Sequence, residues 1–363
     1  MKAWLYLLSA TVFLSACSVA NSNESQSSKD PNFKDGIYVN NHVDHPDKSF
    51  FTFLKMRFFG DDEWANHEQD AHLIPKIQLS RQNLSATNNQ VSWLGHSTFL
   101  VQLNGLNILT DPVFSERASP VSFAGPKRYT QVALPMKDLP KIDVVVISHN
   151  HYDHLDKESI KGIGDQAKYF VPSGLKSWFM ELGIADEQVV ELMWWQSFKF
   201  GELQLTAMPS QHWSARGLGD RHQSHWASWL ITQKKSSIWF AGDTGYNDKD
   251  FVNIGQYLKQ QALNLDLALI PIGAYGPRHF MKTYHVDTEE AVQIHKDIGS
   301  KLSIGMHWGA FPLTSESPME PYEWLNRLRT ENKLGQYPFK TLKIGETITL
   351  IDSKKLLTAQ KTE

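Results

Sequence analysis

Four residues of one short segment have side chains that commonly bind metal ions. His149, His151, Asp153 and His154 form the pattern His-x-His-x-Asp-His. Imidazole and carboxylate groups suit zinc, and so many of them within six residues are improbable on a solvated surface loop. The first two histidines can turn toward one ion, and the Asp-His pair that follows can turn toward a second. The segment therefore predicts a metal centre rather than a polar loop.

Three further residues, like this segment, come just after a predicted strand. The pattern His-x-His-x-Asp-His follows the run 144–147, and the others are His212, Asp243 and His307. Strand ends in layered α/β folds meet at one edge, where sites are usually built. A lone histidine is more often structural than a metal ligand. These three residues become candidate metal ligands because they share this placement.

The elements that must position these residues alternate along the chain. The run Val144–Ile147 is β-branched and continuous, which is typical of a strand buried on both faces of an α/β protein. Asp287 and Glu290 have the spacing of a helix-capping box. Together with 144–147, strands are predicted over 91–94, 98–103, 107–110, 204–208, 228–232, 237–240, 266–270 and 302–306, and helices over 155–163, 174–182, 248–258, 288–298 and 320–328.

The segment HNHYDHLD, with the later His, Asp and His, resembles the metallo-β-lactamase superfamily. More narrowly, the chain resembles the N-acylphosphatidylethanolamine-hydrolysing phospholipases D. The resemblance runs from about Val91 to beyond His307. It rests on WLGHST, LTDPVFSERASP, GPKRY, ISHNHYDHLD, PSQHW, FAGDTGY, HVDTEEAVQIH and MHWG. It implies an α/β fold, the four-layer αβ/βα metallo-β-lactamase sandwich.

The resemblance implies a role for each candidate residue and a cofactor of two Zn²⁺ ions per chain. His149, His151 and His212 would bind the first ion, Asp153, His154 and His307 the second, and Asp243 would bridge them. Asp153, Asp243 and His285 would be catalytic, and Tyr152 and His285 would contact the phospholipid substrate. From the residues alone, Tyr152 is better interpreted as a packing aromatic and His285 as a polar loop residue.

The activity implied is hydrolysis of N-acylphosphatidylethanolamine-type phospholipids to N-acylethanolamine and phosphatidic acid by a metal-bound hydroxide. The same fold could instead act on a lactone, a sugar or cyclic phosphate, or another phospholipid, because fold does not fix substrate. A non-catalytic lipoprotein is a further alternative, but no zinc ligand of the implied set is missing. The formal net charge of −3 and the lack of a basic run argue against a nucleic-acid partner. A homodimer is compatible with the sequence.

The first residues indicate export and lipidation rather than folded structure. Residues 1–17 have a short apolar run and end in Leu-Ser-Ala-Cys, which resembles a bacterial lipobox with Cys17 as the lipidated residue. A chance cysteine in an ordinary secretory signal is the simpler alternative. Acyl chains on Cys17 would anchor the chain to a membrane. Ser18 after the cysteine resembles the sorting pattern for the outer membrane, facing the periplasm.

The remaining chain divides by composition. Residues 18–31 are polar and predict a flexible tether, 32–90 an N-terminal extension that packs on the core, 91–352 the catalytic domain and 353–363 a tail. The extension contains the aromatic stretch Phe50–Phe59, predicted as a helix or an arm. Its apolar side chains are expected to bury against the domain, with a membrane-facing surface as the alternative. Trp194 and Trp195 are interpreted either as core residues or as contacts for acyl chains. His222 and His225 are expected to be loop residues, with a place at the site entrance as the alternative.

Overall fold

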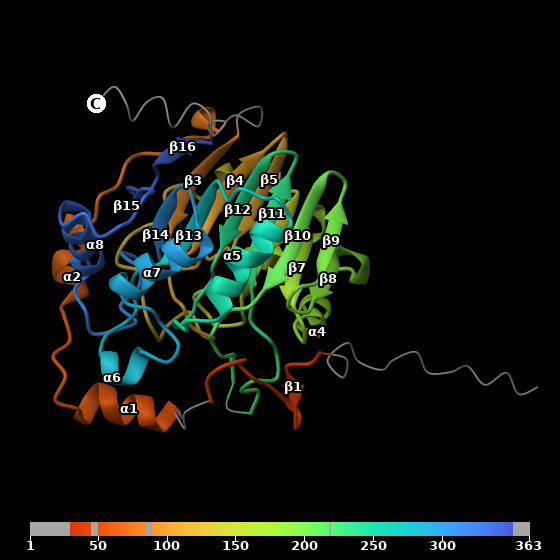
Figure 1. Cartoon of the computed structure of the whole chain (residues 1–363). Helices are drawn as coiled ribbons and strands as arrows, with labels where there is room; N and C mark the ends of the chain where they lie inside the picture. Colours follow the sequence, from red (N-terminus) through yellow and green to blue (C-terminus); the bar gives the residue numbers. More distant parts are fainter. Residues whose placement is uncertain (1–29, 45–49, 85–88, 218, 351–363) are drawn as a thin grey trace, which may run out of the picture.

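A computed structural model describes residues 30–44, 50–84, 89–217 and 219–350, and two seven-stranded mixed sheets form its centre (Figure 1). In spatial order, the first sheet contains β16 (Thr347–Thr349), β3 (Gln90–Gly95), β4 (Thr98–Leu103), β5 (Leu106–Thr110), β6 (Val144–Val146), β7 (Lys168–Pro172) and β8 (Val189–Leu192). The second contains β15 (Phe339–Thr341), β14 (Ser303–Met306), β13 (Leu267–Pro271), β12 (Ser236–Phe240), β11 (Ser228–Gln233), β10 (Leu203–Met208) and β9 (Ser197–Phe200).

Residues on the two faces of the first sheet belong to different hydrophobic clusters. Val144 and Val146 belong to the cluster between the sheets, whereas Val145 and Ile147 belong to the cluster on the opposite face. This division follows from the period of two along a strand. The helices α3 (Lys157–Ile163) and α4 (Lys176–Glu181) cover the outer face through residues such as Ile160 and Phe179.

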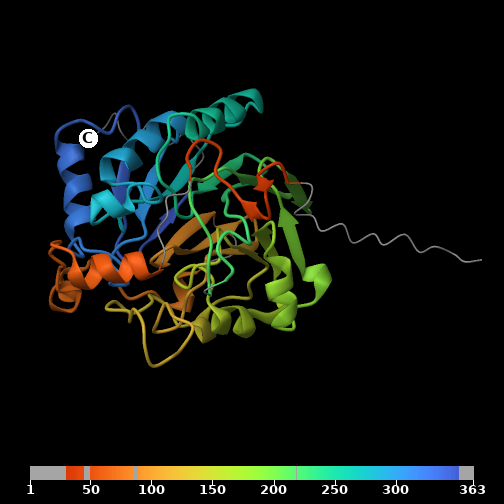
Figure 2. The same cartoon turned by 90° about the horizontal axis from the view of Figure 1, so that it is seen from below.

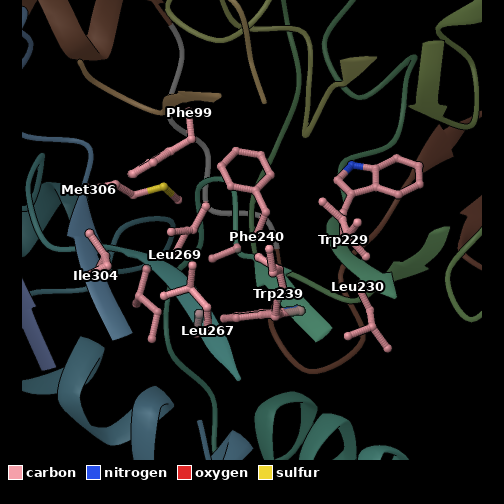
Figure 3. Close-up of a cluster of buried hydrophobic side chains, with 14 of the residues drawn as sticks. Phe99, Trp229, Leu230, Trp239, Phe240, Leu267, Leu269, Ile304 and Met306 are labelled. Carbon is pink, nitrogen blue, oxygen red and sulfur yellow. The ribbon is translucent and has the colours of Figure 1, made fainter. Parts of the chain in front are cut away.

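The second sheet is covered on its outer side by α5 (Asp250–Gln260), α7 (Thr288–Ile298) and α8 (Glu320–Thr330). Between the sheets, Phe99 of β4 lies among Phe240, Leu269 and Met306 of the second sheet (Figure 3). The order of layers is therefore helices, sheet, sheet, helices. The predicted αβ/βα sandwich is confirmed.

The predicted elements are present with small shifts at their ends. The strand 98–103 and the helix 288–298 have the predicted bounds, and Asp287 and Glu290 make both hydrogen bonds of the capping box. The sequence prediction missed strands β7, β8, β9, β15 and β16. It also missed α6 (Arg278–Met281) and short 3₁₀ helices over Met136–Asp138, Gly164–Gln166 and Asp186–Gln188.

The described N-terminal segment, through α1, lies against the edge of the sandwich from which the loops after the strands emerge, and the chain then runs along the side of the sandwich to the start of β3 (Figures 1 and 2). It contains β1 (Phe33–Lys34), β2 (Ile37–Tyr38), α1 (Phe50–Phe59), α2 (His67–Asp70) and 3₁₀ turns over Ala71–Leu73 and Arg81–Asn83. The aromatic stretch is thus a helix. Phe53 packs on Phe280 of α6 and Met56 is buried, while 84% of Phe59 is exposed.

The residues expected to form the signal, the lipidation site Cys17 and most of the tether lie outside the described residues, as does the whole of the C-terminal tail 353–363. Over the part of the chain that the structure describes, no helix combines the length and the apolar character needed to cross a membrane.

Candidate metal centre

The loop that carries the pattern His-x-His-x-Asp-His follows β6 and is held from two sides. On one side, Asp111 accepts hydrogen bonds from the Ser148 backbone N–H at 2.7 Å and from the Ser148 hydroxyl at 2.5 Å. On the other side, the Arg216 guanidinium donates to the carbonyl oxygens of Asn150 and Leu155, both at 2.7 Å. These contacts fix the backbone on either side of the histidines, so their rings are positioned before any ligand binds.

The first group of converging nitrogens belongs to His149, His151 and His212. The Nδ1 atom of His151 lies 2.8 Å from His149 Nε2 and 3.3 Å from His212 Nε2. The far nitrogen of His149 faces the Ser148 hydroxyl at 2.8 Å, and that of His212 faces the Tyr284 carbonyl at 2.9 Å. Such outer contacts turn the other ring nitrogen toward a common point, as they do for metal-bound histidines.

The second group contains Asp153, His154 and His307. The Nε2 atoms of His154 and His307 are 3.1 Å apart, and each lies 3.3 Å from Asp153 Oδ2. Ligands of a tetrahedral zinc ion with bonds of ~2.0–2.1 Å are separated by about 3.3 Å. The spacing of these atoms therefore fits a single zinc ion.

Asp243 lies between the two groups. Its Oδ2 atom is 3.2 Å from both His154 Nε2 and His307 Nε2, and 3.9 Å from His212 Nε2. Its Oδ1 atom is buried and has no hydrogen-bond partner among the described residues. A buried carboxylate oxygen without a partner is costly unless a cation binds it. The structure thus brings all seven residues together in the arrangement that the family resemblance implies, and their binding of metal stays a prediction.

The two groups differ in charge. Burial, together with the neighbouring imidazoles, holds the pKa values of His149 and His151 well below the usual range, and burial lowers the pKa of His212 to about 4. These imidazoles are neutral at pH 7 and keep lone pairs available to a metal. Burial also acts to lower the pKa of His307, but Asp243 and Asp153 outweigh it and raise the pKa to about 9. The second group therefore attracts positive charge, as a cation site should.

Three supporting residues were not among the predicted site residues. Asp111 accepts a hydrogen bond from His154 Nδ1 at 2.6 Å, and His96 Nε2 lies 2.9 Å from Asp153 Oδ2. Asn40 of the N-terminal segment donates to the His212 carbonyl at 2.9 Å and accepts from the His212 N–H at 3.1 Å. Asp111 directly follows β5 and His96 directly follows β3, so the strand-end pattern could have found both. No sequence signal marks Asn40.

The two residues with predicted substrate contacts are placed differently. His285 Nδ1 lies 3.8 Å from Asp243 Oδ2, and burial lowers the His285 pKa to about 3, so this imidazole is neutral. The Tyr152 hydroxyl donates to the Arg216 carbonyl at 2.7 Å, and the Arg216 guanidinium lies over the Tyr152 ring, 4.1 Å from its centroid. His285 therefore borders the metal group, whereas Tyr152 contacts the residue that braces the metal-ligand loop. The substrate contacts of both stay predictions.

The structure places His222 and His225 outside the groups of metal-capable side chains, and Trp194 and Trp195 pack elsewhere. His222 and His225 are in a loop, as expected, and both are buried. The His225 ring packs between Tyr38 and Trp194, with centroid distances of 4.7 and 4.3 Å. Trp194 is a core residue, while the partly exposed Trp195 packs on Tyr257 of α5. These contacts agree with core packing for Trp194 and give it no access to an acyl chain.

The comparisons with known proteins agree with the geometry. The model of the family described as the β-lactamase superfamily domain matches residues 106–308. The chain is 42% identical over 267 residues to N-acyl-phosphatidylethanolamine-hydrolyzing phospholipase D 1 of Caenorhabditis elegans, a match that covers 70% of this chain and 74% of that protein. It is 39% identical over 244 residues to the mitochondrial enzyme of the same name from Saccharomyces cerevisiae, covering 65% of this chain and 51% of that protein.

A solved structure supports the fold independently. The archaeal metallo hydrolase Igni18 of Ignicoccus hospitalis superimposes with a TM-score of 0.53 at 22% identity, covering 73% of this chain and 99% of that one. At this level of identity the match concerns the fold alone. The described fold, the converging histidines and aspartates, and the family match lead to one conclusion: this chain belongs to the β-lactamase superfamily and is a metal-dependent hydrolase of the metallo-β-lactamase fold.

Proposed function

We propose that this protein is a two-zinc phosphodiesterase that hydrolyses N-acylphosphatidylethanolamine-type phospholipids to N-acylethanolamine and phosphatidic acid. The single observation that carries the proposal is the position of Asp243 between two groups of metal-capable side chains. A pair of sites that share a carboxylate suits an in-line displacement at phosphorus. The similarity to two phospholipases of this specificity favours this substrate over other phosphodiesters and lactones.

The residues that would hold the metal are those already described. His149, His151 and His212 would bind one ion, Asp153, His154 and His307 the other, and Asp243 both. Bound in this way, two zinc ions would supply Lewis acidity toward a phosphate oxygen and lower the pKa of a coordinated water toward ~7. Asp111 would keep the proton of His154 on Nδ1 so that Nε2 faces the ion.

His285 is the residue best placed to act on the substrate itself. Only 12% of its side chain is exposed, and its ring packs edge-on against His212 with a centroid distance of 5.1 Å. Because it is neutral, it can donate one hydrogen bond to a phosphate oxygen without repelling the nearby metal ligands. Tyr152 would contribute indirectly, because its hydroxyl and ring hold Arg216 against the metal-ligand loop.

The proposed substrate lies in a membrane, and two exposed aromatics suit a lipid surface. Phe59 at the end of α1 is 84% exposed, and Phe123, in the loop after β5, is 81% exposed. The base of that loop packs beside the site, because Val113 and Ala118 share a cluster with Tyr152 and Phe311. We therefore propose that the protein works on a membrane surface, anchored through acylated Cys17 and located at the outer membrane facing the periplasm.

Product analysis tests the proposal directly. The full chain, purified in detergent and loaded with zinc, would be incubated with N-acylphosphatidylethanolamine in mixed micelles. We expect mass spectrometry to detect N-acylethanolamine and phosphatidic acid in equal amounts. Asp243→Asn should abolish both products, and Asp186→Asn, which changes an exposed aspartate of a surface ion pair, should leave them unchanged. Two bound zinc ions without either product would overturn the substrate assignment.

A further inference from the structure

His96 adds a third imidazole to the second metal group. It lies in the turn between β3 and β4 and is fully buried. Its ring centroid is 4.1 Å from that of His307, and its Nε2 atom is 2.9 Å from Asp153 Oδ2. The ligand set described above assigns no role to it.

The backbone holds His96 in an unusual conformation. Its φ angle of 55° lies in the left-handed region, which is unfavourable for a residue with a Cβ atom. Two hydrogen bonds to its carbonyl oxygen keep it there, from the Trp93 indole at 2.9 Å and from the His307 N–H at 3.2 Å. The second of these bonds ties the turn to His307, so a shift of this turn would move both His96 and His307.

Two distances indicate what His96 does with Asp153. The contact between His96 Nε2 and Asp153 Oδ2, at 2.9 Å, is a hydrogen-bond length, whereas His154 and His307 both lie 3.3 Å from that oxygen. In addition, Asp153, His154, His307 and Asp243 would already provide four ligands for the second ion, which is the number that zinc usually takes. The ion therefore needs no fifth ligand, whereas the Asp153 carboxylate needs a hydrogen-bond donor to hold its orientation.

We propose that His96 is a positioning residue that donates its Nε2–H to Asp153 and thereby orients this carboxylate for the second metal ion. The inference rests on the proposed metal centre and is independent of the substrate. The ring is held for this task by its contact with His307 and by the edge of Phe311, whose centroid is 5.2 Å away. Without the donor, Asp153 would turn away from the ion.

The test compares His96→Gln with His96→Ala in the full chain. A glutamine amide nitrogen can reach the position of Nε2 and donate the same hydrogen bond, yet it is a poor zinc ligand. We expect His96→Ala to weaken binding of the second zinc ion by about 10- to 100-fold, as losing an outer partner of a ligand does. His96→Gln should stay within about threefold of the unchanged protein. Chelator competition measures both, and His295→Gln, a buried histidine on α7, is the matched control.

Cobalt substitution separates a hydrogen-bond donor from a ligand. If His96 orients Asp153, the visible spectrum of the Co²⁺-loaded His96→Gln protein should match that of the unchanged protein. Equal loss of the second ion in both variants, with an altered Co²⁺ spectrum, would show that His96 is a ligand and overturn the proposal. Unchanged metal affinity in a folded His96→Ala protein would also overturn it. If His96→Ala does not fold, the glutamine variant decides alone, and neither readout depends on phospholipid turnover.

Discussion

Asp111 shows how one outer residue can orient a proposed metal ligand. Its carboxylate accepts three hydrogen bonds, from the Ser148 N–H, the Ser148 hydroxyl and His154 Nδ1. It is fully buried, and burial raises its pKa despite the compensating effect of His154. One charge therefore orients both the metal-ligand loop and the ring of His154.

Replacing this charge should weaken the metal site without removing any ligand. In Asp111→Asn, the amide can still contact Ser148 but no longer holds the proton of His154 on Nδ1 as strongly. We expect zinc affinity at the second site to fall by about 10- to 100-fold. Chelator competition measures this fall, with Asp186→Asn as the exposed control. An Asp111→Asn protein that keeps both ions with unchanged affinity would contradict the role given to Asp111.

The site residues found from the sequence and those missed differ in a physical way. His212, Asp243 and His307 follow buried strands, and strand ends meet at one edge, so their convergence could be predicted. Asn40 acts through a tertiary contact that no local pattern encodes, whereas His96 directly follows β3 and fits the strand-end pattern, although it was not among the predicted site residues. Asn40 is 172 positions away from His212, and it hydrogen-bonds to both the N–H and the carbonyl oxygen of that residue.

At the scale of elements, the sequence predicts the buried strands better than the edge strands. The run that forms β6 is continuous and apolar, and its position was predicted to within one residue. Strands β9 and β16 lie at sheet edges and have partly exposed residues, so their hydrophobic pattern is weak. Pairing with a neighbouring strand, which is a property of the folded chain, makes them strands.

The turn after β12 depends on a glycine. Gly242 has a φ angle of 60°, and a Cβ atom there would lie 2.4 Å from the Ser148 Cβ. We expect Gly242→Ala to lower the free energy of unfolding by about 1–3 kcal/mol and to displace Asp243 from the metal groups. Urea denaturation and zinc counting check the two effects. Gly201→Ala, also at a positive φ of 60° but with open space around it, is the control for backbone strain alone. Equal effects of the two changes would contradict the predicted collision with Ser148.

The contact of α7 with β14 contains a buried histidine that should make stability depend on pH. His295 faces the Ser303 hydroxyl at 2.7 Å and the Tyr337 carbonyl at 3.1 Å, and burial lowers its pKa to about 4. Between about pH 6.5 and 4 the unfolded state binds this proton and the folded state does not, so stability falls as the pH falls. The full effect is up to about 3 kcal/mol.

The measurement is urea denaturation across this pH window. In His295→Gln the titrating group is gone, so the loss of stability from pH 7 to pH 4.5 should be smaller than in the unchanged protein. Both proteins would be compared without metal, because the metal ligands also titrate. Parallel pH profiles of the two proteins would show that His295 does not titrate as described.

At the scale of the whole molecule, the proposed metal ligands come from both sheets. His149, His151, Asp153 and His154 follow β6 of the first sheet, whereas His212, Asp243 and His307 follow strands of the second. Each group of ligands contains residues from both sheets. A bound ion therefore connects the two halves of the sandwich at one edge.

Removal of metal should consequently destabilise the entire fold. A ligand that binds only the folded state adds about 2.7 kcal/mol at a free concentration of 100 times Kd. We expect a strong chelator to lower the midpoint of thermal unfolding by several degrees, and added zinc to restore it. Differential scanning calorimetry measures the shift, and Asp243→Asn should show a smaller one. A midpoint insensitive to chelator would argue against metal binding at this interface.

The division of the ligands between the two sheets also bears on the order of events during folding. His154 and His307 are 153 positions apart in the chain, yet their Nε2 atoms are 3.1 Å apart. This pair of atoms comes together only after the two halves have docked, so we expect it to form late in folding. Interactions absent from the transition state slow unfolding and leave the folding rate almost unchanged. A bound ion would thus slow the unfolding of the enzyme without accelerating its folding.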